Sequence, residues 1–198
     1  APFWNFQLGV PDKIMAHTSS PATTAYPSWS QVEYSFNQSP VTGKPLKLTW
    51  GDGGKKPMKP KGSHPNLDLP NQGYYMEGSK MTVMSPHPGS PQPIAIHGQE
   101  YSSAVKDAER HWRDESKKVK EQNHYARWID AAKSGKFGDA GSNFDYSVPL
   151  TQAIVLGCIA QRFPGQELIW DQKNERFSNH SEANQWLSFK ARSGFDIA

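Results

Sequence analysis

The residues with the clearest potential for chemistry lie in one short polar turn. The stretch "GSNFDYS" places Asn143, Asp145 and Tyr146 directly before an apolar segment that is expected to be helical. A helix N-terminus favours anions and polar ligand groups, because its first N–H groups lack intrahelical partners. One interpretation is the polar edge of a ligand pocket. The other is structural: Asp145 or Ser147 caps the helix while Phe144 and Tyr146 pack on the core.

Other catalytic patterns are missing from the sequence. The glycine-rich "GDGGKK" lacks the spacing of a dinucleotide fingerprint or a P-loop, and no Gly-x-Ser-x-Gly segment occurs. None of the seven histidines stands at metal-ligand spacing from another His or from the single cysteine, Cys158. We therefore predict no catalytic residue, no cofactor site and no metal site in this chain.

The charge balance argues against a nucleic-acid partner. The formal net charge is only +3, and the one basic cluster, "GKKPMKPKG" (54–62), contains neither Arg nor an aromatic residue. We interpret it as a solvated surface loop, with phosphate binding as the alternative. No apolar run is long enough to span a membrane, and "APFWNFQLGVPDK" does not resemble a signal peptide. We expect a soluble protein, in the cytoplasm or exported to the periplasm.

Alternating apolar side chains predict several strands in the first half of the chain. In "SQVEYSFN" (30–37) every second residue is apolar, and "KPLKLTWGDG" (44–53) repeats the pattern. "KIMAHTS" (13–19) is also strand-like, and "GYYMEGSKMTVMS" (73–85) is typical of a hairpin turning at Glu77-Gly78. These segments indicate a sheet with one covered face.

The segments between these strands are irregular. Residues 51–72 are poor in apolar side chains and predict a long insertion loop, and "SPHPGSPQP" (85–93) predicts another irregular stretch. Residues 2–8 resemble the end of a helix that Gly9 stops in a left-handed conformation.

Helices are expected in the second half. The charged segment 106–120 predicts an exposed helix or an ordered excursion, and "HYARWIDAAKSGK" (124–136) predicts a helix closed by Gly135. In the latter, the expected apolar face is formed by Tyr125, Trp128, Ile129 and Ala132. The next helix should begin near Ser147, with Pro149 in its first turn, and should be buried on several sides because it is apolar all round.

The chain ends in a predicted strand pair and a short helix. "GQELIWD" (165–171) and "ERFSN" (175–179) form the pair, and "SEANQWLSFKARSGFDI" (181–197) contains the capped helix and a tail. Strands followed by helices predict an α+β fold: an open, mostly antiparallel sheet with helices packed on one face. We expect residues 1–198 to form a single domain.

The order of these segments resembles the C-terminal half of the Gfo/Idh/MocA oxidoreductases, most closely a bacterial branch of sugar or glycoside dehydrogenases. The resemblance is carried by "HYARWIDAAKSGK", "SNFDYSVPLTQAIVLGCIAQRFPGQELIWD" and "RFSNHSEANQWL", and also by the opening "APFWNFQLGVPDK". It extends over the whole chain, is most specific from 143 to 171, and is weak over 51–72 and 102–122.

The resemblance implies a substrate-binding and oligomerisation domain whose partner is an N-terminal Rossmann domain. That domain would bind NAD or NADP and would carry the catalytic residues, so none is assigned here and this chain alone is expected to be inactive. The sheet face is implied as a homo-oligomer contact. A sugar-like small molecule is implied as substrate, and Asn143, Asp145 and Tyr146 are candidate substrate-binding residues.

Two alternatives stay open on the sequence. The chain could be a stand-alone module that binds a carbohydrate or a protein without catalysis. It could also belong to a protein that uses the family scaffold for non-redox glycoside chemistry with a bound nicotinamide. The sequence does not separate these alternatives from the first interpretation, because a similar fold serves different functions.

Overall fold

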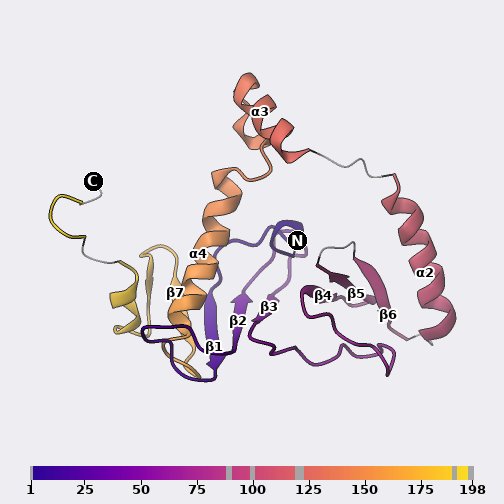
Figure 1. Cartoon of the computed structure of the whole chain (residues 1–198), viewed down its shortest axis with the longest axis horizontal. Helices are drawn as coiled ribbons and strands as arrows, with labels where there is room; N and C mark the ends of the chain where they lie inside the picture. The colour runs from indigo at the N-terminus through magenta and orange to yellow at the C-terminus, as the bar shows by residue number, and fades with distance from the viewer. Residues whose placement is uncertain (1, 88–90, 99–100, 119–122, 189–190, 196–198) are drawn as a thin grey trace. The chain divides into compact units, whose positions relative to one another are not determined.

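The computed structural model describes residues 2–87, 91–98, 101–118, 123–188 and 191–195 (Figure 1). The chain divides into two units, one formed by residues 1–55 and 128–198 and the other by residues 56–127. Sheets and helices occur in both, so the α+β class predicted from the sequence is confirmed. The prediction of a single C-terminal domain over 1–198 stays a prediction.

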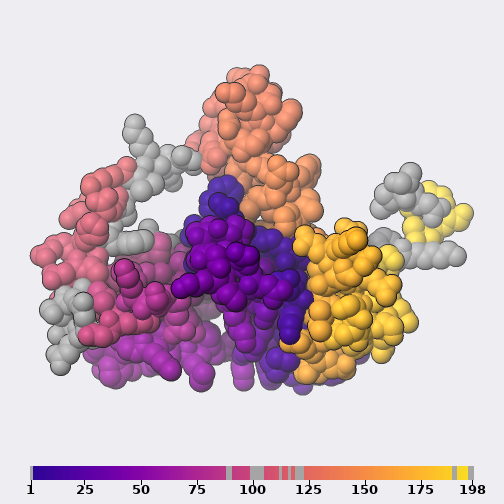
Figure 2. All heavy atoms as spheres, turned by 180° about the vertical axis from the view of Figure 1, so that it is seen from behind, coloured from indigo at the N-terminus to yellow at the C-terminus, as the bar shows by residue number. Residues whose placement is uncertain are grey.

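The first unit is built on a five-stranded sheet in which all neighbouring strands are antiparallel. In spatial order the strands are β3 (Leu46–Gly51), β2 (Ser30–Phe36), β1 (Lys13–Thr18), β7 (Leu168–Asp171) and β8 (Arg176–Phe177). Strands from the two ends of the chain therefore pair at β1–β7. Figure 2 shows the yellow-orange C-terminal segment side by side with the indigo N-terminal one.

The strand registers place alternate residues on one buried face. Ile14 pairs with Tyr34 and with Leu168, and Tyr34 pairs with Leu48 on the next strand. The predicted alternation in β2 is confirmed by its regular switch between buried and half-buried positions. The expected hairpin at 168–177 is also present, with Trp170 opposite Phe177.

Helix α4 (Phe144–Ala160) covers this face of the sheet and contacts β1 and β2 (Figure 1). The helix contributes Ala153, Leu156, Ile159 and Ala160 to the core, whose other buried members come from the strands and from α1 (Pro2–Asn5). The prediction that α4 is buried on several sides is wrong within this unit. Ile154 and Val155 are about half exposed, because one face of the helix points away from the sheet.

The described residues of the second unit include a three-stranded antiparallel sheet and the helix α2. The strands are β4 (Gly73–Glu77), β5 (Met81–Pro86) and β6 (Gln92–Ile96), and α2 (Tyr101–Ser116) packs against β6. The predicted hairpin is confirmed, with the Gly78 N–H donating to the Met81 carbonyl at 2.9 Å. Strand β6 was not expected, because it begins inside the Pro-rich stretch 85–93. Residues 88–90 of that stretch lie outside the described residues.

The predicted loop at 51–72 is confirmed from 52 onward, where neither helix nor strand forms before β4. Its lysines make local contacts: Lys59 donates to the Pro65 carbonyl at 3.0 Å, and Lys56 lies 3.8 Å from Asp68. The basic cluster is therefore a surface loop, as the first interpretation held. Helix α2 confirms the helical prediction for 106–120 up to Ser116, and residues 119 and 120 are outside the described part.

The ends of several helices differ from expectation. Gln7, with φ of 49°, takes the left-handed conformation that was assigned to Gly9. Helix α3 (His124–Ser134) is closed by Gly135 at φ of 70°, as predicted. Its expected apolar face is nevertheless exposed, since Trp128 is 67% accessible. The final helix is a short 3₁₀ turn, η2 (Ala183–Trp186), and residues 189–190 and 196–198 of its predicted tail are not described.

Candidate functional site

The polar turn singled out in the sequence caps α4. The Asn143 Oδ1 accepts the Tyr146 N–H at 3.2 Å, and the Asn143 Nδ2 donates to the carbonyls of Ala140 at 2.9 Å and Gly138 at 3.2 Å. The cap is therefore Asn143, and not Asp145 or Ser147. Helix α4 begins at Phe144, which is three residues before the expected start near Ser147.

The other two candidate residues have different surroundings. Asp145 is exposed in the first turn, where its charge complements the helix dipole. The Tyr146 ring packs edge-on against Trp4 at 4.9 Å and Phe3 at 6.4 Å, measured between ring centroids. The expected packing role of Tyr146 is thus present, whereas Phe144 is 82% exposed. A substrate-binding role for Asn143, Asp145 and Tyr146 stays a prediction.

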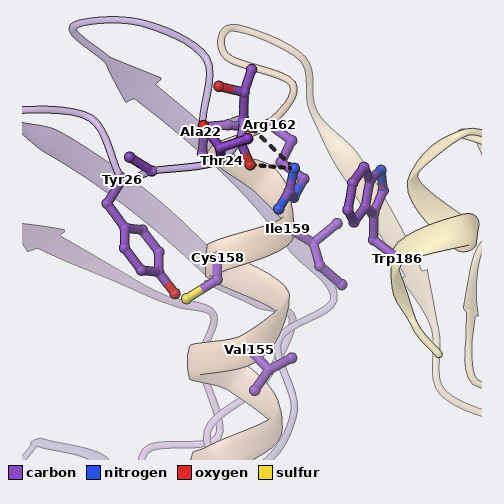
Figure 3. Close-up of a pocket in the computed structure, with 10 residues that line it drawn as sticks. Ala22, Thr24, Tyr26, Val155, Cys158, Ile159, Arg162 and Trp186 are labelled. Atoms are coloured by element: carbon purple, nitrogen blue, oxygen red, sulfur yellow. Dashed lines mark hydrogen bonds between the residues drawn. The ribbon is translucent and has the colours of Figure 1, made fainter. Parts of the chain in front are cut away.

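A pocket lies at the other end of α4, within the first unit (Figure 3). Its volume is about 310 Å³, at the lower end of the usual range for ligand pockets. Helix α4 contributes three lining residues, and the segment after the helix and η2 contribute Arg162 and Trp186. The opposite wall is the 22–26 segment of the β1–β2 connection.

Arg162 is the central polar group of this pocket. Its Nη1 donates to the carbonyls of Ala22 at 3.2 Å and Thr23 at 3.1 Å. The guanidinium carbon lies 3.5 Å from the centroid of the Trp186 ring, a cation–π stack. Figure 3 shows the guanidinium between the 22–24 segment and the indole. Arg162 therefore holds three separate segments of the chain together.

The pocket was not predicted from the sequence. The 22–26 segment lies about 140 residues before Arg162 and matches no motif, and Trp186 lies on a short turn whose orientation the sequence does not indicate. The only partial signal was the position of Arg162 just after an apolar helix, where a cation complements the helix C-terminus.

Polar side chains of the run "RFSNHSEANQWL" make structural contacts. Asn184 Oδ1 accepts the Phe177 N–H at 2.7 Å, and its Nδ2 donates to the Phe177 carbonyl at 3.0 Å. His180 Nδ1 accepts the Ala183 N–H at 3.1 Å, so its Nε2 is the nitrogen that donates to Gln166 at 2.9 Å. In this segment the Asn184 amide therefore stabilises strand β8.

Burial changes the titration of one tyrosine in this unit. Tyr34 lies beneath α4, and burial, with a smaller effect of the neighbouring Cys158, raises the pKa of its phenol. No group of three or more His, Cys, Asp and Glu residues is placed to hold a metal ion within the described ranges.

Comparison of the sequence with protein-family models finds no match, and a search among curated proteins finds none either. The class that the geometry defines is an α+β protein with an open antiparallel sheet and a helix-end pocket. In the residues that the structure describes, no helix combines the length and the apolar character needed to cross a membrane.

Proposed function

We propose that this chain is the substrate-binding and oligomerisation domain of an NAD(P)-dependent oxidoreductase of the Gfo/Idh/MocA type, acting on a sugar, polyol or glycoside. The observation that carries the proposal is the five-stranded antiparallel sheet with α4 across one face and the β7–β8 hairpin after it. The resemblance implies an open, largely antiparallel sheet with helices on one face for the family's second domain, although a shared fold does not by itself define an activity.

The residues present do not fit a dinucleotide. Helix α4 follows the 3₁₀ turn η1 (Phe137–Asp139) and an asparagine cap, whereas a dinucleotide site needs a glycine-rich turn between a strand and a helix. In this proposal, NAD or NADP and the hydride-transfer residues belong to a separate Rossmann domain. No catalytic step is assigned to this chain.

The outward face of α4 supports docking of a second domain. Val148, Ile154 and Val155 are each about half exposed, and all three lie on the side of the helix that does not pack on the sheet. Contiguous exposed apolar side chains on a helix are typical of a surface that another domain or chain covers. The Rossmann domain is the occupant that the proposal names.

The other face of the sheet supports a subunit contact of mixed polarity. Glu33 on β2 lies 3.4 Å from the Lys47 ammonium and 3.8 Å from the His17 imidazole, measured from a carboxylate oxygen to the nitrogen. Such paired charges suit the polar, hydrated part of an oligomer interface. In the proposal this face mediates self-association.

The proposal is tested by the intact mass and N-terminal sequence of the protein purified from its native source. We expect a polypeptide roughly twice this length, with a Gly-x-Gly-x-x-Gly segment in its first half. We also expect the 198-residue chain to show no NAD(P)-dependent turnover of sugars. A native polypeptide that begins at Ala1 would contradict the oxidoreductase proposal and favour the stand-alone binding module.

A further inference from the structure

Among the residues that the structure describes, one edge of the Arg162 guanidinium has no hydrogen-bond partner. A guanidinium has five N–H donors, and the two hydrogen bonds to the 22–23 carbonyls both use Nη1. The Nε and Nη2 groups form the edge that matches a carboxylate in bidentate geometry. Across the described residues, none of the ion pairs includes Arg162.

The side chain is also held in position before any ligand arrives. Trp186 stacks on one face of the guanidinium, and the 22–23 carbonyls fix one nitrogen. A ligand would therefore lose less conformational entropy in ordering this arginine than in ordering a free surface arginine. A preorganised cation in a pocket is a stronger basis for recognition than an exposed charge alone.

The rest of the pocket lining contains both apolar and polar side chains. Val155 and Ile159 line the helix side, and the Trp186 ring closes another side. The 22–26 wall includes Thr23, Thr24 and Tyr26, whose side chains carry hydroxyl groups. No Asp or Glu occurs among the described lining residues. These walls suit a hydrocarbon or aromatic body, while the charge suits one anionic group at its end.

A single negative charge fits this position better than a phosphate dianion. Arg162 follows α4, whose C-terminal carbonyls carry a partial negative charge. That partial charge repels anions, and it repels a dianion more strongly than a carboxylate with a single charge. A phosphate site also normally recruits several backbone N–H groups or further cations, and Arg162 is the only cation among the lining residues that the structure describes.

We propose that the pocket between α4, the 22–26 segment and Trp186 binds a small monocarboxylate with an apolar body, whose carboxylate pairs with the Nε–Nη2 edge of Arg162. The site goes beyond the proposed oxidoreductase function, but it shares Val155 with the face of α4 that is proposed to dock a second domain, so binding is measured on the 198-residue chain alone. The pocket lies about 25 Å along the α4 axis from the Asn143 turn, given 17 helical residues at about 1.5 Å each.

The experiment measures binding of 3-phenylpropionate to the 198-residue chain by tryptophan fluorescence and by calorimetry. Its neutral matched probe is 3-phenylpropanamide, and inorganic phosphate is the third ligand. We expect the carboxylate to bind at least about ten-fold more tightly than the amide, because the charge-assisted bidentate pair is lost with the amide. We expect phosphate to show weaker binding than the carboxylate.

Two variants locate the site. Arg162→Lys keeps the charge but removes the forked geometry, and it should weaken carboxylate binding about ten-fold. Val155→Glu places a carboxylate in the pocket wall at a half-exposed position and should abolish carboxylate binding. Its matched control is Ile154→Glu, since that residue is adjacent, 54% exposed compared with 49% for Val155, and does not line the pocket.

Circular dichroism of each variant shows whether the fold is kept, and Val155→Glu provides the test if Arg162→Lys does not fold. Carboxylate binding that survives in Val155→Glu would overturn the proposal, as would equal binding of acid and amide or no binding at millimolar concentration. Tighter binding of phosphate would overturn the ligand class. Equal loss in Ile154→Glu would show that the site is elsewhere on α4.

Discussion

Gly157 of α4 lies directly over the phenol of Tyr34 on β2. A Cβ atom built on Gly157 would overlap the Tyr34 hydroxyl oxygen and would stand 2.9 Å from its Cζ. The missing side chain therefore lets the helix approach the sheet at the one place where a large aromatic residue projects from the centre of β2. The contact explains a glycine within a helix, where glycine otherwise costs about 1 kcal/mol relative to alanine.

We predict that Gly157→Ala destabilises the first unit despite the better helix propensity of alanine. The new methyl group must displace the buried Tyr34 ring or α4, and overpacking of this kind costs about 1–3 kcal/mol. The measurement is the urea midpoint of unfolding. Gly138→Ala is the control, because nothing lies within 4 Å of a Cβ at that position.

A second variant separates overpacking from other effects of the substitution. Combining Gly157→Ala with Tyr34→Phe removes the hydroxyl oxygen that the new methyl group would overlap, so the double variant should recover part of the lost stability. If Gly157→Ala is as stable as the unchanged protein, the close approach of α4 and β2 described here is wrong.

We expect the protein to lose stability at high pH because of the buried Tyr34. Burial raises the pKa of its phenol in the folded state above the ordinary value of 10.0. As pH rises beyond this value, the unfolded chain loses the proton while the folded chain keeps it, so the free energy of unfolding falls. The stabilising effect is complete below about pH 10 and is lost as pH rises toward the folded-state pKa.

The measurement is the urea midpoint between pH 8 and pH 11. Tyr34→Phe should reduce the slope of stability against pH in this range, whereas Tyr125→Phe should leave it unchanged because that ring is mostly exposed. Identical slopes for Tyr34→Phe and the unchanged protein would contradict the prediction.

The strands of the sheet were predictable because the alternation of apolar and polar residues is contained within each short segment. The period-two pattern of Val32, Tyr34 and Phe36 indicates which face of β2 is buried, and the structure agrees. The apolar face of α4 was not predictable, since nearly every position in 150–160 is apolar and the pattern has no period that marks the covered side. The sequence therefore does not indicate that Ile154 and Val155 are the exposed positions.

In the candidate site, too, the features formed by neighbouring residues were predictable, and those formed by residues distant in the sequence were not. The cap at α4 was predictable as a polar turn, but Asn, Asp and Ser, all common capping residues, occur within five positions, and the sequence does not indicate that Asn143 is the one that caps. The pocket could not be predicted, because Arg162 meets carbonyls of Ala22 and Thr23 across about 140 residues. Backbone carbonyls have no sequence signature.

We expect Asn143 to contribute to the stability of the folded chain. Asn143→Ala removes the acceptor for the Tyr146 N–H and the amide that donates to the Ala140 carbonyl, so we expect a loss of about 1 kcal/mol. Asn143→Asp keeps the acceptor and should lose less. The measurement is the urea midpoint, with Ser142→Ala as the exposed control. A stable Asn143→Ala variant would contradict the capping role.

Asn184 should hold β8 as a neighbouring strand would. Its amide pairs with both backbone groups of Phe177, whose side chain is almost fully buried. Asn184→Ala would leave the Phe177 N–H and carbonyl without these partners, and we expect a loss of about 1–3 kcal/mol in the free energy of unfolding. The measurement is the urea midpoint, and hydrogen exchange at Phe177 should accelerate. Gln185→Ala is the control, because that neighbouring side chain is exposed.

In the Asn184→Asp variant, we expect the free energy of unfolding to depend on pH. The aspartate keeps an acceptor for the Phe177 N–H, but its second oxygen faces the Phe177 carbonyl in place of a donor. The protonated acid can donate to that carbonyl, so folding should favour the protonated form and raise the pKa of the new carboxyl. The stability gap between variant and unchanged protein should therefore narrow as pH falls toward about 4. A gap that is constant between pH 7 and pH 4 would show that the Phe177 carbonyl does not depend on this donor.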